Sequence, residues 1–289
     1  MRARFVPLIL GLIWPIAGVA EELVLLGQVS FDTEIVAGIS GLEVNDDGSE
    51  FLAVSDRGWW IEGTFQRSGD TLTNVEIEDI QPILGSKGLP VAARRVADWS
   101  DAEGLLVATD GSIWVSFERW AHVAVYREGI SGKAKWIKDH ATFFDFADNW
   151  QLEAMAQAPD GTVYVFPERP LAEGFPIYRL DGTVWTIDRH LPENDVFSIV
   201  GADFDMKTGD LFLLERKLVV GLWWQSRIRR VKLETGEDEA LWTSERGEYL
   251  NLEGLAVWHD DEGLRLTLVS DDNGDRDEPM QFVEFRLTD

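Results

Sequence analysis

Cysteine is absent from the 289-residue chain, and basic residues are scarce relative to acidic ones. Without thiols the protein has no disulfide bonds, thiolate metal ligands, cysteine nucleophile or lipid-modified cysteine. Lys and Arg total 26 against 52 Asp and Glu, which gives a formal net charge of -26. Nucleic acids and anionic lipid surfaces are bound through clustered Lys and Arg. The charge therefore argues against both as partners and leaves open a small anion or a bound cation.

The usual signatures of nucleophilic and zinc catalysis are also missing. No G-x-S-x-G sequence occurs, since the segment from Gly38 to Gly41 has the wrong spacing. The histidines show neither H-E-x-x-H nor H-x-H spacing, which argues against a zinc site. They are His122, His140, His190 and His259. Acid–base chemistry by carboxylates, with or without a metal ion, is the chemistry that remains.

A long apolar run occurs only at the start of the chain. Two arginines precede an apolar stretch from Phe5 to Ala20, which ends in small residues of the kind that signal peptidase reads. A stretch of about 16 apolar residues that contains a proline is short for a membrane anchor. We therefore expect residues 1–20 to be a Sec-type signal peptide cleaved near Ala20. Residues 21–289 would then form one mature domain, periplasmic or secreted.

The rest of the chain repeats one pattern five times. Each repeat has a short apolar run, a turn rich in Asp and Gly, a second apolar run and a carboxylate. The repeats begin at Ser40, Glu103, Glu153, Gly201 and Glu253. Asp-Gly pairs between apolar runs favour β-hairpins, and helical periodicity is nearly absent. Four strands in roughly 50 residues, repeated along the chain, are typical of a β-propeller.

We therefore predict an all-β fold, a single β-propeller of five blades, with six blades or a β-sandwich as alternatives. The last repeat ends in a strand at residues 281–287, and too little chain follows it for a fourth strand. The run from Leu23 to Phe31 is expected to supply that strand and to close the ring. The first repeat is about a dozen residues longer than the others. We assign the excess to a loop from Gln81 to Asp98 rather than to a sixth blade.

Equivalent positions of the blades should form rings around the channel. The position before the innermost strand is acidic in three repeats, and we predict these glutamates as the catalytic carboxylates: Glu103, Glu153 and Glu253. The position after the second strand is acidic in all repeats, and these acids are the predicted metal ligands: Asp56, Glu118, Glu168, Glu215 and Asp271. Carboxylate oxygens are natural ligands of hard divalent cations.

An arginine follows the strand-end acid in four repeats. These are Arg57, Arg119, Arg169 and Arg216. They are predicted to bind an anionic substrate, and the alternative is that they join blades through salt bridges.

The acidic segment 271–278 matches the first half of a calcium-binding loop at Asp271, Asn273 and Asp275. Arg276 stands where such a loop requires glycine, so the segment is not an EF-hand. A calcium site completed by other loops is one hypothesis, and a solvated acidic hairpin is the other.

Several motifs together resemble one protein family. They are the run GLEVNDDGSEFLAVSDRG, the strand starts EGLL, LEAM and LEGLAV, the strand ends FER and PER, and the closing LVSDDN. Through them, residues 22–289 resemble the "esterase-like activity of phytase" family, also called phytase-like proteins. The resemblance implies an exported bacterial β-propeller that hydrolyses esters or phosphoesters. Calcium-dependent propeller phytases hold calcium in acidic clusters, so calcium is the cofactor that the resemblance implies.

Two functions fit these observations. The first is a calcium-assisted hydrolase of small phosphate or carboxylic esters at the channel mouth, with a lactonase-like hydrolase as a variant. The second is a non-catalytic periplasmic propeller that binds a ligand or protein. Its contact residues would include exposed aromatic side chains: Trp59, Trp60, Trp120, Trp150, Trp223 and Trp224. For both we expect a monomer that binds no nucleic acid and, after signal cleavage, no membrane.

Overall fold

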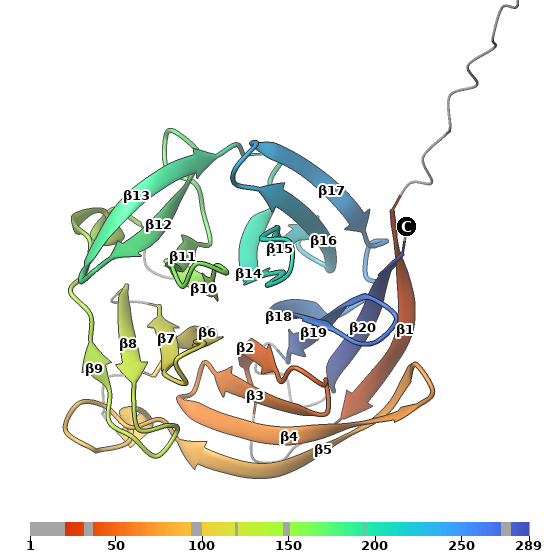
Figure 1. Cartoon of the computed structure of the whole chain (residues 1–289), viewed down its shortest axis with the longest axis horizontal. Helices are drawn as coiled ribbons and strands as arrows, with labels where there is room; N and C mark the ends of the chain where they lie inside the picture. The colour runs from red at the N-terminus through yellow and green to blue at the C-terminus, as the bar shows by residue number, and fades with distance from the viewer. Residues whose placement is uncertain are drawn as a thin grey trace, which may run out of the picture.

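Five four-stranded antiparallel sheets are arranged in a ring in the computed structural model (Figure 1). The structure describes residues 21–31, 37–93, 100–118, 121–146, 151–193, 195–272 and 279–288. The predicted signal peptide, residues 1–20, lies outside these ranges, as do Arg119, Trp120, Trp150 and residues 273–278. The predicted all-β propeller of five blades is confirmed, and the described residues form no sixth sheet.

Blades 1 to 4 follow chain order, and each runs from the innermost strand outward. Blade 1 contains β2 (Ile39–Val44), β3 (Glu50–Ser55), β4 (Trp59–Ser68) and β5 (Thr71–Pro82). Blade 2 contains β6 (Ala102–Val107), β7 (Ile113–Phe117), β8 (His122–Tyr126) and β9 (Lys135–Trp136). Blade 3 contains β10 (Leu152–Gln157), β11 (Val163–Pro167), β12 (Phe175–Asp181) and β13 (Val184–Leu191). Blade 4 contains β14 (Ser198–Phe204), β15 (Leu211–Val219), β16 (Trp223–Lys232) and β17 (Glu237–Thr243).

Blade 5 joins the two ends of the described chain. It contains β18 (Asn251–His259), β19 (Leu264–Asp271) and β20 (Met280–Thr288), with β1 (Glu22–Phe31) as its outermost strand. Strand β1 pairs antiparallel with β20 along its whole length. The predicted closure by an N-terminal strand is therefore confirmed, and it removes the open sheet edge that an unclosed ring would expose.

The greater length of the first repeat has two sources. Strands β4 and β5 have 10 and 12 residues, whereas β7 and β8 of the next blade have 5 each. The predicted loop from Gln81 to Asp98 contributes the rest, but its first two residues belong to β5. A short 3-10 helix, η1 (Val91–Ala93), and a second one, η3 (Ala141–Asp145), lie between strands. Among the described residues no helix is long and apolar enough to cross a bilayer.

Apolar side chains fill the spaces between adjacent blades. Each of five buried clusters combines residues of two neighbouring blades; one contains Phe166 of β11 and Phe204 of β14. Every residue of β7, β8 and β11 is buried, because blades cover both faces of these strands. This explains why their sequences read as continuous apolar runs rather than as alternating ones.

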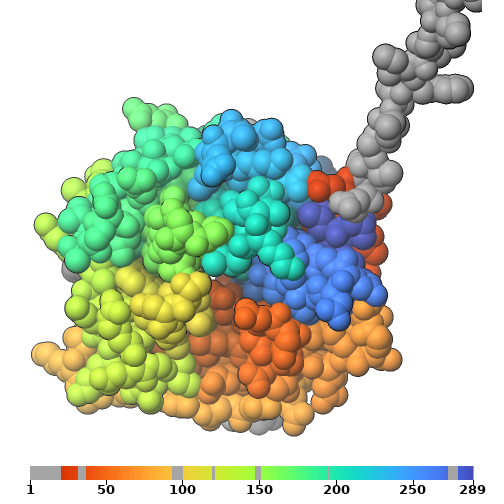
Figure 2. Space-filling model, in the orientation of Figure 1, coloured from red at the N-terminus to blue at the C-terminus, as the bar shows by residue number. Residues whose placement is uncertain are grey.

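Glycines let the innermost strands approach each other closely. A Cβ atom on Gly41 would lie 2.6 Å from the carbonyl oxygen of Glu103, and one on Gly104 would lie 2.9 Å from the carbonyl carbon of Ala154. The blades therefore close tightly around the axis (Figure 2). The cavity there has a volume of about 10 Å³, room for a single water molecule. Larger ligands would have to bind at an end of the channel.

Candidate active site at the channel mouth

A β-bulge places one residue of each innermost strand outside the hydrogen-bonded ladder. Pairing between the first two strands of every blade shifts register near the start of the innermost strand. The residues at these shifts are Ser40, Glu103, Glu153, Val200 and Glu253. All five line the cavity on the axis. Bulges redirect side chains, so the fold presents three glutamates at equivalent places around the channel.

Blade 4 departs from the predicted alignment by one residue. We expected Gly201 in the ring, but Gly201 pairs with Leu214 and the ring position is Val200. The same shift moves Arg216, which pairs with Ser198, into the strand-end position that acids occupy elsewhere. Glu215, a predicted metal ligand, is instead fully buried on the other side of β15. There its carboxylate lies 2.6 Å from Arg227 Nε and 3.1 Å from Arg229 Nη1.

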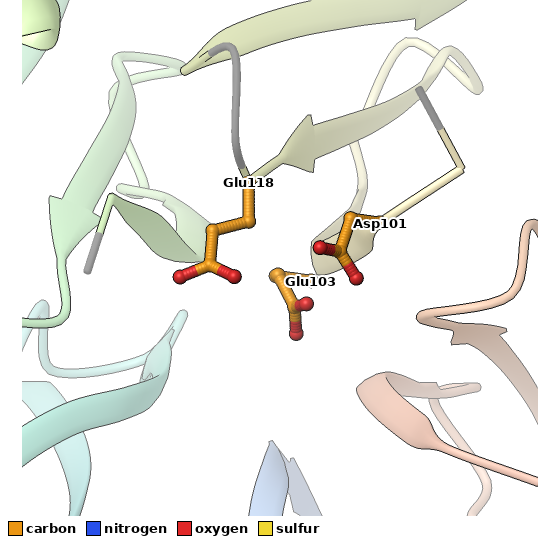
Figure 3. A group of neighbouring side chains, drawn as sticks. All are labelled: Asp101, Glu103 and Glu118. Carbon is orange, nitrogen blue, oxygen red and sulfur yellow. The ribbon is translucent and has the colours of Figure 1, made fainter. Parts of the chain in front are cut away.

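Three carboxylates of blade 2 converge at the mouth (Figure 3). One oxygen each from Asp101, Glu103 and Glu118 lie within 4.8 Å of one another. The backbone brings them together, because Glu118 N donates a 2.8 Å hydrogen bond to the carbonyl of Asp101. Asp101 was not among the predicted ligands. The signal for it was a polar residue two positions before the bulge, which recurs as Gln151 and Asn251.

A second group of carboxylates joins blades 2 and 3. It consists of Glu118, Glu153 and Glu168, whose oxygens also lie within 4.8 Å of one another. All three residues are buried, with 6–7% of their surface exposed. Glu168 N donates to the carbonyl of Gln151, which repeats the contact between Glu118 and Asp101. Predicted catalytic and predicted metal-binding residues thus occupy one cluster.

Burial and mutual repulsion perturb these carboxyl groups strongly. Burial raises the pKa of Glu118 to about 7, and the charges of Asp101 and Glu168 add to the effect. Burial also raises the pKa of Glu103 well above its usual value, and Glu153 and Glu253 contribute repulsion. The pKa of Glu153 is raised well above its usual value by burial and by Glu168 and Glu118. The site therefore favours bound protons or bound cations at neutral pH.

Among the described arginines of the predicted set, Arg216 is the least exposed, with 14% of its side chain exposed. Its Nη1 atom contacts the carboxylate of Glu253 and lies 2.7 Å from Asn251 Oδ1. Its Nη2 atom lies 3.8 Å from Glu168, and the guanidinium stacks 5.1 Å from the ring of Trp224. Asn251 also donates a 2.7 Å hydrogen bond to Glu253. Glu253 is therefore held by Arg216 and Asn251 and belongs to neither carboxylate group.

The other two described arginines lie at the rim. Arg57 is 43% exposed and 3.8 Å from Asp56, and Arg169 is 40% exposed and 3.7 Å from Glu168. Burial raises the pKa of Asp56 to about 7, with repulsion from Asp101 as the next cause. Rim guanidinium groups of this kind are accessible to a dissolved anion.

The fifth strand-end acid, Asp271, is the last residue of β19 and pairs with Asn251. Its neighbour Asp272 is buried and accepts a 3.1 Å hydrogen bond from Gly38 N. This contact ties blade 5 to the start of blade 1. The rest of the segment compared with a calcium loop, residues 273–278, lies outside the described ranges.

The donor set of the two groups fits a hard divalent cation. Calcium–oxygen distances of about 2.3–2.6 Å separate ligands on opposite sides of an ion by about 5 Å at most, and the oxygens of each group lie within 4.8 Å of one another. Neither group contains histidine, so the set does not suit zinc. Glu103 is 7% exposed and makes no hydrogen bond or ion pair with another described residue. A buried carboxylate of this kind needs a cation or a proton.

Solved structures share the propeller fold at low sequence identity. A catalytically inactive virginiamycin B lyase from Staphylococcus aureus, solved with quinupristin, is 10% identical; the alignment covers 93% of this chain and 100% of that one, with a TM-score of 0.50. A gluconolactonase from Xanthomonas campestris is 12% identical over 86% of this chain and 72% of that one, with a TM-score of 0.46. These similarities concern the fold alone.

No protein of curated function matches the chain. The model of one protein family, described as "Phytase-like: Esterase-like activity of phytase", matches residues 34–274. The match includes all five innermost strands and both carboxylate groups. The chain belongs to the phytase-like family.

Proposed function

We propose that the protein is a calcium-assisted hydrolase of small phosphate or carboxylic esters that acts at the channel mouth. The observation that carries the proposal is the convergence of five carboxylates from blades 2 and 3, four of them buried, in two groups with cation-ligand spacing. Burying charges without partners is expensive. Such an arrangement is therefore more typical of a functional site than of a structural one.

The residues at the channel mouth have three different roles in this proposal. Glu103, Glu118, Glu153 and Glu168 would hold calcium, which polarises an ester and lowers the pKa of a bound water. Arg57 and Arg169, half-exposed beside the cluster, would bind the anionic part of the substrate. Glu253 and Asn251 hold Arg216 in place, so that a fixed positive charge faces the carboxylates from blade 4.

The location of the protein is part of the same proposal. Family membership and the apolar segment up to Ala20 support export, with the mature domain acting as a monomer in the periplasm or medium. The N-terminal sequence and mass of the protein recovered from cells would test it. A chain that keeps residues 1–20 would contradict cleavage.

Metal-dependent stability and turnover test the function together. The melting temperature is measured in chelator and in millimolar calcium, and hydrolysis is assayed with p-nitrophenyl phosphate, p-nitrophenyl acetate and a lactone. Free calcium at a hundred times its dissociation constant should raise the free energy of unfolding by about 2.7 kcal/mol. We expect a calcium-specific rise in melting temperature and calcium-dependent turnover, both lost in Glu103→Gln and Glu153→Gln. The control Arg57→Gln should keep the calcium-specific rise in melting temperature. An equal rise with monovalent salt of matched ionic strength would refute the metal site.

One observation favours the non-catalytic alternative. The hairpin of β15 and β16 extends beyond Arg216 and ends in exposed apolar side chains: Leu218, Val220, Leu222 and Trp223. Val220 has φ 48°, a strained value for a β-branched residue. Exposed apolar clusters mark binding surfaces. Of the other predicted aromatic contacts, Trp60 is fully buried and does not serve this role.

Turnover separates the two functions. A binding propeller would hydrolyse no ester at any calcium concentration, and Trp223→Ser would weaken retention of the protein on an apolar resin while leaving its fold intact. A hydrolase would lose turnover in Glu103→Gln and keep it in Trp223→Ser.

A further inference from the structure

The two carboxylate groups share a single residue. Glu118 belongs to both, whereas Asp101 and Glu103 belong only to the first group and Glu153 and Glu168 only to the second. An ion within coordination distance of the first group is therefore not equally close to the second. The spacing describes two adjacent coordination sites rather than one large one.

The orientation of Glu118 fits this division. Figure 3 shows one of its carboxylate oxygens on the side of Glu103 and Asp101, and the other pointing to the opposite side. A carboxylate with two divergent oxygens can bind one cation through each. Glu118 N is fixed to the carbonyl of Asp101 at 2.8 Å, so the start of this side chain is anchored between the two groups.

Charge and burial point to the same conclusion. The Glu103 carboxylate has no hydrogen-bonding or ion-pairing partner among the described residues, is 7% exposed and lies between Asp101 and Glu118 in Figure 3. When ionised, the five residues carry five negative charges. One divalent ion offsets two of them and two ions offset four. One negative charge remains, and Arg169 beside Glu168 offsets it, since Arg216 is paired mainly with Glu253 outside the two groups.

We infer that the channel mouth holds two divalent cations bridged by the Glu118 carboxylate, one on Asp101 and Glu103 and the other on Glu153 and Glu168. The inference deepens the proposed function and rests on it for the location of the site. Three protein residues per ion leave coordination positions for water and substrate oxygens. Two adjacent ions are the arrangement that stabilises both the attacking and the leaving oxygen in phosphoester hydrolysis, which favours phosphoesters over carboxylic esters as substrates.

Metal stoichiometry of the full mature chain tests the inference without reference to turnover. Mn²⁺ and Ca²⁺ binding are measured by calorimetry and by metal analysis after gel filtration, and the Mn²⁺-loaded protein is examined by electron paramagnetic resonance. We expect two ions per chain and the broadened spectrum of a coupled pair. Asp101→Asn and Glu153→Gln should each retain one ion and show the spectrum of an isolated Mn²⁺. Glu118→Gln should weaken both sites at least tenfold.

A matched control comes from a partly buried carboxylate outside the cluster. Glu43 lies on β2, is also strongly desolvated and accepts a 3.0 Å hydrogen bond from Val107 N. Glu43→Gln should still bind two ions. Saturation of the wild type at one ion, or at none, would overturn the inference, as would two ions in Asp101→Asn.

Ester turnover measured on the same samples keeps the two proposals apart. Two bound ions without hydrolysis would refute the hydrolase and leave the bridged site standing. Hydrolysis with one bound ion would refute the bridged site and leave the hydrolase.

Discussion

Replacing Arg216 with methionine should destabilise the metal-free protein by about 3–5 kcal/mol, the cost of leaving a buried ion pair without one partner. Methionine keeps an unbranched chain over Trp224, so the main loss is the positive charge beside Glu253 and Glu168. Protonation limits the cost. A glutamate with an ordinary pKa of about 4.3 can be neutralised at pH 7 for roughly 3.7 kcal/mol, and at pH 5 for about 1 kcal/mol. The loss should therefore shrink on acidification.

Denaturant unfolding in chelator at pH 7 and pH 5, and again in millimolar calcium, measures this loss. Calcium should restore part of the stability of Arg216→Met, because bound cations supply the missing positive charge to the same carboxylates. Arg216→Lys should lose less than Arg216→Met. The rim variants Arg57→Met and Arg169→Met, whose side chains are 43% and 40% exposed, should each lose less than about 1 kcal/mol.

Two results would refute this reasoning about Arg216. One is a loss below about 1 kcal/mol for Arg216→Met at pH 7, the value expected of an exposed pair. The other is an equal loss at pH 5 and pH 7, which would mean that packing rather than charge accounts for the change.

Three further predictions concern the carboxylates and the channel. The pKa of Glu118 is raised to about 7 in the folded protein, so ionisation of this group opposes folding. The free energy of unfolding in chelator should therefore rise as the pH falls from 8 to 5, by up to ~3 kcal/mol for this group. Glu118→Gln should flatten that rise. Glu215→Gln should lower the unfolding free energy by about 3–5 kcal/mol, because Arg227 and Arg229 lose their buried partner, yet leave the calcium-induced shift in melting temperature unchanged. Gly104→Ala should lower the urea midpoint by an amount equivalent to about 1–3 kcal/mol, because its Cβ would meet the backbone of Ala154 at 2.9 Å.

The fold could be predicted because its signals are local and repeated. Asp110-Gly111 shows the basis: Gly111 adopts φ +80°, and Asp110 Oδ1 accepts a 2.9 Å hydrogen bond from Ser112 N. Such turns recur once per blade in the first three blades, so hairpins and their spacing are readable from sequence. The closing strand was also predictable, because one blade lacked a strand and the N-terminal run had the composition to supply it.

The frame of blade 4 could not be predicted in the same way. Aligning Glu215-Arg216 with the Glu-Arg pairs of other repeats gives a plausible match of residue types. The structure instead aligns the blades by the bulge, which is set by backbone pairing of Ile199 with Glu215 and Gly201 with Leu214. A one-residue change of frame exchanges the two faces of a strand. Glu215 thereby leaves the channel mouth and Arg216 enters it.

This exchange gives the site its polarity. In the other four blades the strand-end position is acidic, and in three the bulge residue is also acidic, so a symmetric fifth blade would have completed a ring of carboxylates with no buried counter-charge. Blade 4 instead contributes Val200 and Arg216. Arg216 neutralises Glu253 and one side of Glu168, so its charge acts on the blade 3 side of the cluster, while Asp101 and Glu103 of blade 2 converge with Glu118 on the other side. Cations should therefore collect on blades 2 and 3, with the fixed positive charge of blade 4 facing them, and a substrate anion bound at the mouth would lie between two positive sides.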